Sequence, residues 1–147
     1  KAVSAGNNAI AITADDVALT GTLSSGTNTT TLNDSDGTGA GLGNTAVSNG
    51  LNVSGTELQN VTAQGFEIAT AGTITVDGIS AANSNNLSGT TTLDATGVIT
   101  FATNASTFNT LAVESDGGIA VNVDLTTDAG AHEISKIYFL YFLNNYF

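Results

Sequence analysis

The chain has 147 residues, with 13 acidic side chains, two basic side chains and a formal net charge of −11. Arginine is absent, and the two lysines, Lys1 and Lys136, stand at opposite ends of the sequence. Because nucleic-acid binding relies on Lys and Arg to displace phosphate counterions, this charge balance excludes it, and anionic membrane surfaces would repel the chain. The absence of cysteine excludes disulfides and thiolate metal sites.

Short alternations of apolar and polar residues recur along the whole chain. Period-two alternation indicates strands with one buried face, and the abundance of β-branched Thr favours the same structure. Clusters of Asn, Asp, Ser and Gly separate these segments and are typical of turns. In chain order, strands are expected at 10–12, 17–20, 51–53, 66–68, 73–76, 98–101, 111–113 and 119–123.

A coarser repeat links these strands. One apolar residue taken from each segment recurs in steps of 20 to 23 residues, at Ile12, Leu32, Val53, Val76, Ile99 and Val121. A repeat of this length is typical of architectures in which each unit buries its apolar face against the next. The sequence therefore predicts an all-β fold, a parallel β-helix whose stacked turns share one core, over residues 1–135.

An antiparallel β-sandwich is the alternative fold. The dipeptides Asp36-Gly37, Asn49-Gly50 and Asp77-Gly78 are strong signals for two-residue hairpin turns, which join antiparallel strands. The two folds differ in the direction of neighbouring strands, so the strand pairing decides between them.

Three segments resemble repeats of filamentous-haemagglutinin-like surface proteins. The phrase ADDVALTG at 14–21 and the phrase ELQNVTA at 57–63 carry the resemblance most specifically, and AGTITVDG at 71–78 adds to it. The resemblance covers roughly residues 8–134. It implies a right-handed parallel β-helix, export through an outer-membrane secretion partner or an autotransporter route, and a role in adhesion at the bacterial surface. It brings neither catalytic residues nor a receptor.

Residues 136–147 differ from the preceding repeat. This segment contains all three tyrosines and three of the six phenylalanines, but no Gly, Thr or Ser. Its apolar run is far shorter than the ~20 residues of a membrane-spanning helix, so no membrane insertion is expected. We interpret the segment as foreign to the repeat, either as a cap or as an artefact of the reading frame.

Candidate sites are few. Asp34 and Asp36 precede Gly37 in a sequence that resembles the start of a calcium loop, but the twelfth position, where an EF-hand has Glu, is Thr45. His132, the only histidine, lies near Asp128 and Glu133 and is interpreted as a surface residue. We therefore expect no catalytic residue, no cofactor and no metal site, with Asp34 and Asp36 as a weak calcium candidate.

Two functional alternatives remain beside adhesion. A β-helical carbohydrate-active enzyme or phage tailspike would need a cleft with two close carboxylates, and the repeat lacks the Arg or Lys that uronate lyases use and the Trp or Tyr of sugar platforms. Phe66, Phe101 and Phe108 are expected in the core. An ice-binding protein would need a flat, aligned threonine face, for which the Thr-x-Thr triplets at 20–22, 29–31, 73–75 and 90–92 are candidates.

The sequence thus predicts a non-enzymatic protein, secreted to the bacterial surface, in which this chain is a segment of a structural shaft. Its expected partners are receptors or glycans on host or neighbouring cells.

Overall fold

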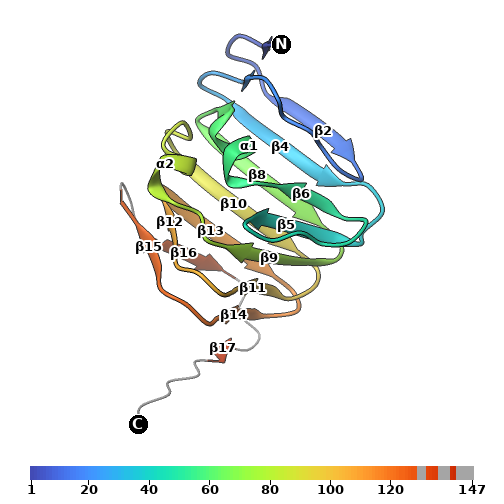
Figure 1. The fold of residues 1–147 in the computed structure, drawn as a ribbon, viewed down its shortest axis with the longest axis vertical. Coiled ribbons are helices and arrows are strands. Elements are labelled where there is room, and N and C mark those ends of the chain that lie inside the picture. The colour runs from blue at the N-terminus through green and yellow to red at the C-terminus, as the bar shows by residue number, and fades with distance from the viewer. Residues whose placement is uncertain (129–131, 136–139, 142–147) are drawn as a thin grey trace.

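The computed structural model describes residues 1–128, 132–135 and 140–141, and side chains up to Asp128. About half of the described chain forms short parallel strands, which are arranged in two six-stranded sheets and two smaller ones (Figure 1). Sheet 1 has the order β16 (His132–Ser135), β13 (Thr110–Ser115), β10 (Thr90–Ala95), β8 (Gly65–Thr70), β4 (Thr29–Asp34), β2 (Ile10–Ala14). Sheet 2 has the order β17 (Leu140–Tyr141), β14 (Ile119–Val121), β11 (Ile99–Phe101), β9 (Thr73–Asp77), β5 (Gly39–Gly43), β6 (Leu51–Val53).

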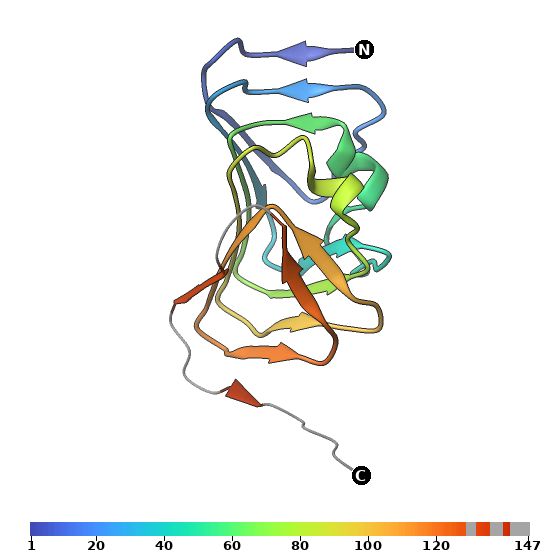
Figure 2. The same cartoon turned by 90° about the vertical axis from the view of Figure 1, so that its left-hand side faces the viewer.

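The remaining strands form a third side of the molecule. Sheet 3 consists of β1 (Val3–Ser4), β3 (Leu23–Ser24) and β7 (Val61–Thr62), and β12 (Ser106–Phe108) pairs with β15 (Leu125–Thr127). The chain passes repeatedly from this side to sheet 1 and then to sheet 2, and we call each such passage a circuit. Successive circuits lie one above the other along the longest axis of the molecule (Figure 2).

Every strand pair within the described residues is parallel. The antiparallel sandwich is therefore wrong. Two of the dipeptides lie at corners of a circuit: Asp36-Gly37 follows β4, and Asp77-Gly78 ends β9. Gly37 and Gly78 adopt positive φ of 74° and 64° there. A turn dipeptide marks a reversal of the backbone, but it does not determine whether the next strand pairs with the previous one.

The register of sheet 1 partly confirms the predicted repeat. Ile12 pairs with Leu32, a step of 20 residues, as expected. Leu32 then pairs with Ile68, a step of 36, and Ile68 pairs with Leu93, a step of 25. The predicted regular step is wrong in the second circuit because the anchors Val53 and Val76 belong to sheet 2, where both lie beside Leu42.

The long second circuit contains an additional strand. After β5 the chain forms a loop over residues 44–50 and returns as β6, which pairs with β5 on the side of the first circuit. The predicted strand over residues 17–20 does not form, since β6 occupies the edge of sheet 2 where that segment would have paired. Residues 15–20 instead contact β6 and its neighbours through side chains; for example, the Asp16 Oδ1 atom accepts a hydrogen bond from the Asn52 amide at 2.9 Å.

One apolar core runs through the circuits. In sheet 1 the inward residues Leu32, Ile68, Leu93 and Val113 stack in register, and each is at most 1% exposed. Each such fully buried side chain contributes about 1.5 to 3 kcal/mol of transfer free energy. Phe66, Phe101 and Phe108 are fully buried in the same core, as predicted.

Two short helices, which the sequence reading did not anticipate, lie at the corner between sheet 2 and the third side. These helices are α1 (Gly55–Gln59) and α2 (Ala81–Ser84), and they lie side by side (Figure 2). The Asn83 Nδ2 atom donates to the Gly55 carbonyl at 3.1 Å. Ser54 and Glu57 form a capping box at α1, a sequence signal for a helix start that the strand pattern masks.

Most of the segment 136–147 lies outside the described residues, so its separation from the repeat stays a prediction. Within it, β17 pairs in parallel with β14, with Leu140 opposite Ile119 and Tyr141 opposite Ala120.

Candidate functional site

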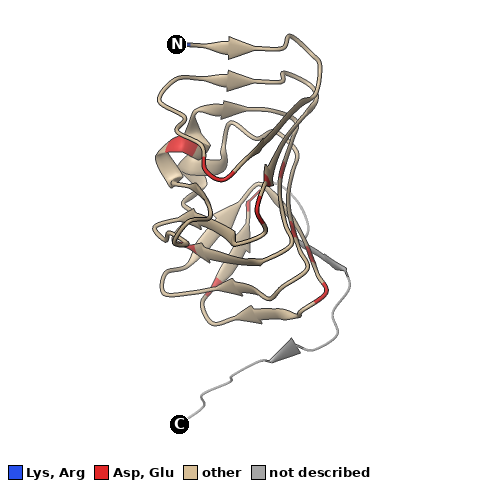
Figure 3. Cartoon of the chain, turned by 90° about the vertical axis from the view of Figure 1, so that its right-hand side faces the viewer, with Lys and Arg blue, Asp and Glu red and all other residues tan. Residues whose placement is uncertain are grey.

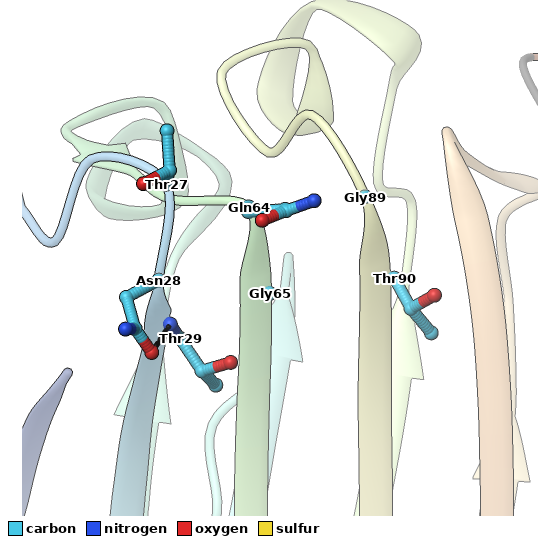
Figure 4. Close-up of a pocket in the computed structure, with 7 residues that line it drawn as sticks. All are labelled: Thr27, Asn28, Thr29, Gln64, Gly65, Gly89 and Thr90. Carbon is cyan, nitrogen blue, oxygen red and sulfur yellow. Dashed lines mark hydrogen bonds between the residues drawn. The ribbon is translucent and has the colours of Figure 1, made fainter. Parts of the chain in front are cut away.

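A surface groove lies where the chain enters sheet 1 from the third side, and it arises from a difference in corner length. In the second circuit four residues, 25–28, connect β3 to β4, whereas in the third circuit only residues 63–64 connect β7 to β8. The longer corner projects beyond the shorter one and leaves a step in the surface. The groove follows this step across β4, β8 and β10 (Figure 4).

Hydrogen bonds hold the projecting corner. The Ser25 hydroxyl donates to the Asn28 carbonyl at 2.9 Å, and the buried Thr30 hydroxyl donates to Ser25 Oγ at 3.0 Å. Gly26 adopts a positive φ of 61°, which glycine tolerates without a steric penalty. The Thr27 amide donates to Asn7 Oδ1 at 3.3 Å, so the corner also rests on the equivalent turn of the first circuit.

The groove is lined by uncharged polar groups and glycine, namely Thr27, Asn28, Thr29, Gln64, Gly65, Gly89 and Thr90. The hydroxyls of Thr27, Thr29 and Thr90 and the Gln64 side-chain amide make no hydrogen bond to another part of the described chain. In Figure 4 the Gln64 side chain extends from the start of β8 toward Gly89, and the Thr29 side chain faces β8. These groups are therefore available to an external ligand.

Glycine at two positions keeps the groove open. A Cβ atom at Gly65 would lie 2.6 Å from Thr29 Oγ1, and one at Gly89 would lie 2.4 Å from the Gln64 carbonyl oxygen. Both distances are too short for a side chain at the glycine. Gly65 therefore allows β8 to approach β4 closely, and Gly89 allows the segment before β10 to approach the segment before β8. Neither glycine adds a side chain to the groove, and the backbone at both positions is accessible from it.

The carboxylates of the calcium candidates Asp34 and Asp36 accept hydrogen bonds from the segment that follows β4, and that of Asp34 also from β8. The Asp34 Oδ2 atom accepts from the Gly39 amide at 2.9 Å and from the Thr70 hydroxyl at 2.7 Å, and Asp36 Oδ1 accepts from the Thr38 amide at 2.9 Å. The Thr38 amide lowers the pKa of Asp36 below its ordinary value because this bond favours the carboxylate form. Within the part of the chain that the structure describes, no three acidic or histidine side chains are grouped to hold a metal.

A second, shallower hollow lies across the outer face of sheet 1, near the C-terminal ends of the strands β4, β8 and β10. Asp34 and Asp94 are among the residues that line it. Their strands, β4 and β10, are separated by β8, so the two backbones lie roughly 10 Å apart at the usual strand spacing. Asp34 alternates inward with Thr30 and Leu32, and its Oδ1 atom is buried, whereas Asp94 is exposed on the outer face. Glycosidases direct both carboxyl groups at one bond, at about 5 to 9.5 Å from each other. Since these two side chains point to opposite faces of the sheet, this hollow does not provide an acid–base pair.

The threonine triplets are distributed over different parts of the surface. Two of the triplets lie on sheet 1, on the strands β4 and β10, and are aligned across the sheet. The strand β8 separates them, and it has Gly65 and Glu67 at the aligned positions instead of threonine. The triplet 73–75 lies on sheet 2, and the triplet 20–22 lies outside the strands. The charge of Glu67 within the array argues against the uniform, uncharged face that ice binding requires.

His132 pairs through its backbone with Leu111, and its side chain lies outside the described part of the structure, so its interpretation as a surface residue stays a prediction. Of the groove residues, Thr29 was singled out from the sequence only as part of a threonine triplet, and Gln64 was not identified. Their proximity depends on the 36-residue step between β4 and β8, and no local motif marks it.

Acidic residues occur at several levels of the stack, on strands and turns (Figure 3). None of them is among the groove residues. Among the described helices none is long and apolar enough to cross a membrane. Comparisons with protein families, curated proteins and solved structures gave no match.

Proposed function

We propose that the chain is a right-handed parallel β-helix segment and serves as the structural shaft of a secreted bacterial surface adhesin. The observation that carries this proposal is the stacking of apolar residues in register across parallel circuits, as in the column Leu32, Ile68, Leu93 and Val113. A core built in this way depends only on contacts between neighbouring circuits, so its length is not limited by the closure of a globular core.

The exposed apolar surface of the first circuit supports an extended array. Ile12, Val17 and Leu19 pack against the core but remain only partly buried, whereas Leu32, Ile68 and Leu93, which continue the register of Ile12 in sheet 1, are fully buried. Val3 is 58% exposed. The outer edges of β1 and β2 also carry no strand partner among the described residues. One more circuit stacked on this end would cover the apolar side chains and pair both edges.

The secreted, adhesive part of the proposal comes from the resemblance of 14–21 and 57–63 to filamentous-haemagglutinin-like repeats. The acidic, polar surface is consistent with an extracellular rod, because like charges keep neighbouring rods apart. The outer-membrane secretion partner and the cell-surface receptors or glycans remain part of the same proposal.

Addition of a circuit tests the shaft. A tandem copy of residues 3–22 inserted before Val3 follows the 20-residue step between Val3 and Leu23. We expect the extra circuit to lengthen the particle by about 4.8 Å in small-angle scattering and to raise the Tm by about 3 °C, because it covers Ile10 and Ile12.

The matched control carries the same insertion with Ser in place of both isoleucines of the added copy. This control should gain no thermal stability, since its inner face is polar. If a protease removes the unmodified added circuit as readily as the serine-containing one, and both melt like the parent chain, the stacking proposal is wrong.

A further inference from the structure

The groove across β4, β8 and β10 contains hydrogen-bonding groups that no described residue satisfies. We propose that this groove binds a neutral oligosaccharide through its hydroxyl groups. The inference adds a binding site to the shaft, and it depends on the local geometry of two circuits rather than on the length of the array.

The side chains around the groove match the chemistry of a sugar. A sugar hydroxyl both donates and accepts, and it is best bound by groups that do the same. The Gln64 amide offers two donors and an acceptor, and the Thr29 hydroxyl offers one donor and an acceptor. Thr29 begins β4 and Gln64 directly precedes the adjacent strand β8, about 4.8 Å away, so both side chains can contact one oligosaccharide that lies across the strands.

Backbone accessibility adds to this match. Gly65 and Gly89 present no side chain, so a sugar ring can approach the main chain at the start of β8 and just before β10. The projecting corner at Thr27 and Asn28 forms a wall on one side of the groove. The groove therefore has a floor and one wall, a shape suited to an extended chain lying across the strands.

The charge of the molecule selects among glycans. A net charge of −11 repels sulfated and uronic-acid polysaccharides, and the groove contains no cation that could pair with them. The absence of carboxylates in the groove disfavours a bound cation, and the absence of large apolar residues disfavours a peptide anchor. An uncharged ligand rich in hydroxyl groups remains the best match.

Binding at one open groove is expected to be weak, with a Kd in the millimolar range, because the ligand stays largely solvated. Several shafts on one cell surface would strengthen attachment through multivalency.

The test is an NMR titration of the whole chain with maltotriose, cellotriose and triacetylchitotriose, with trigalacturonate as the anionic comparison. We expect at least one neutral trisaccharide to shift the Gln64 side-chain amide and the Gly65 and Gly89 backbone amides, and trigalacturonate to leave them unchanged. In the double variant Thr29→Ala/Gln64→Ala, affinity should fall about tenfold, the loss expected for two hydrogen bonds.

The matched control is Thr75→Ala/Thr100→Ala, which removes two outward hydroxyls from sheet 2 and should bind like the parent chain. The inference is overturned if no neutral trisaccharide shifts these amides, if trigalacturonate binds equally well, or if the control loses as much affinity as the groove variant. None of these outcomes affects the added-circuit test, so failure here is distinguishable from failure of the shaft proposal.

Discussion

Asparagine side chains connect each circuit to the one before it. Each amide of this group donates to a backbone carbonyl from an earlier circuit, and the sequence separations lie between 21 and 41 residues. The pairs are Asn28 with Asn7, Asn60 with Leu19, Asn83 with Gly55, Asn86 with Gln59, and Asn109 with Leu87. The high asparagine content thus has a structural role at the corners, where strand ladders end and carbonyls would otherwise lack partners.

Asn109 allows a direct test of this role. Its Nδ2 atom lies 2.7 Å from the carbonyl of Leu87, a fully buried residue. Asn109→Ala should lower the free energy of unfolding by about 1 to 3 kcal/mol, because the buried carbonyl loses its donor. Urea denaturation measures this change. The control Asn33→Ala removes an outward amide that makes no hydrogen bond within the described chain, and it should change stability by less than about 0.5 kcal/mol.

At the scale of elements, helix α1 fixes the segment that precedes β3. Glu57 closes the capping box, as its Oε2 atom accepts from the Ser54 amide at 2.9 Å. Its Oε1 atom accepts from the Leu19 amide at 3.1 Å. The same carboxylate therefore caps the helix and holds residues 15–20 against it, in the place where a strand was expected.

Glu57→Ala should uncouple this segment. We expect a loss of about 1 to 3 kcal/mol in unfolding free energy and faster hydrogen exchange at the Leu19 amide, because the hydrogen bonds from Ser54 and Leu19 to the carboxylate disappear. The comparison variant is Ser80→Ala, which weakens the capping box of α2 without touching Leu19. Unchanged exchange at Leu19 in Glu57→Ala would contradict the role assigned to the carboxylate.

At the scale of the whole molecule, negative charge opposes compaction. The parallel register of β10 and β13 places Asp94 directly beside Glu114 on the outer face of sheet 1. Like charges at paired positions of neighbouring strands destabilise a sheet. The chain carries only two lysines against 13 acidic residues, so few internal partners exist to offset this repulsion.

Salt should therefore stabilise the fold. Raising NaCl from about 0.01 M to about 0.15 M shortens the screening length from roughly 30 Å to 8 Å, and we expect the Tm to rise by a few degrees in calorimetry. The double variant Asp94→Asn/Glu114→Gln should melt higher than the parent chain at low salt and gain less from added salt. Equal salt gains in both proteins would show that this pair does not contribute.

The strand pattern predicted much of the fold because alternation reports burial directly. It identified Ile12 and Leu32 as neighbours and placed Phe66, Phe101 and Phe108 in the core. Alternation does not report which strand lies beside which, so it could not identify β6 as an inserted strand. The same limit explains why residues 17–20, with a clear alternation, form no strand.

The groove could not be predicted from the sequence for a related reason. Thr29, Gln64 and Gly89 are far apart in the sequence, and they meet only through the unequal circuits between β4, β8 and β10. The calcium candidates, by contrast, were evident as a motif, yet the backbone amides of Thr38 and Gly39 bind their carboxylates. A short acidic motif reports which groups are present but not which local partners have already bound them.

The direction of the strand ladders has a mechanical consequence. Because circuits are stacked along the longest axis, the hydrogen bonds between them point along that axis, and a pull on the two ends would load them one after another. Circuits would then detach individually. Each would release as many residues as separate it from the next circuit, and the longest release would come from the 36-residue circuit between Leu32 and Ile68. A tether of this kind yields gradually under tension, and each released circuit lengthens the connection before it breaks.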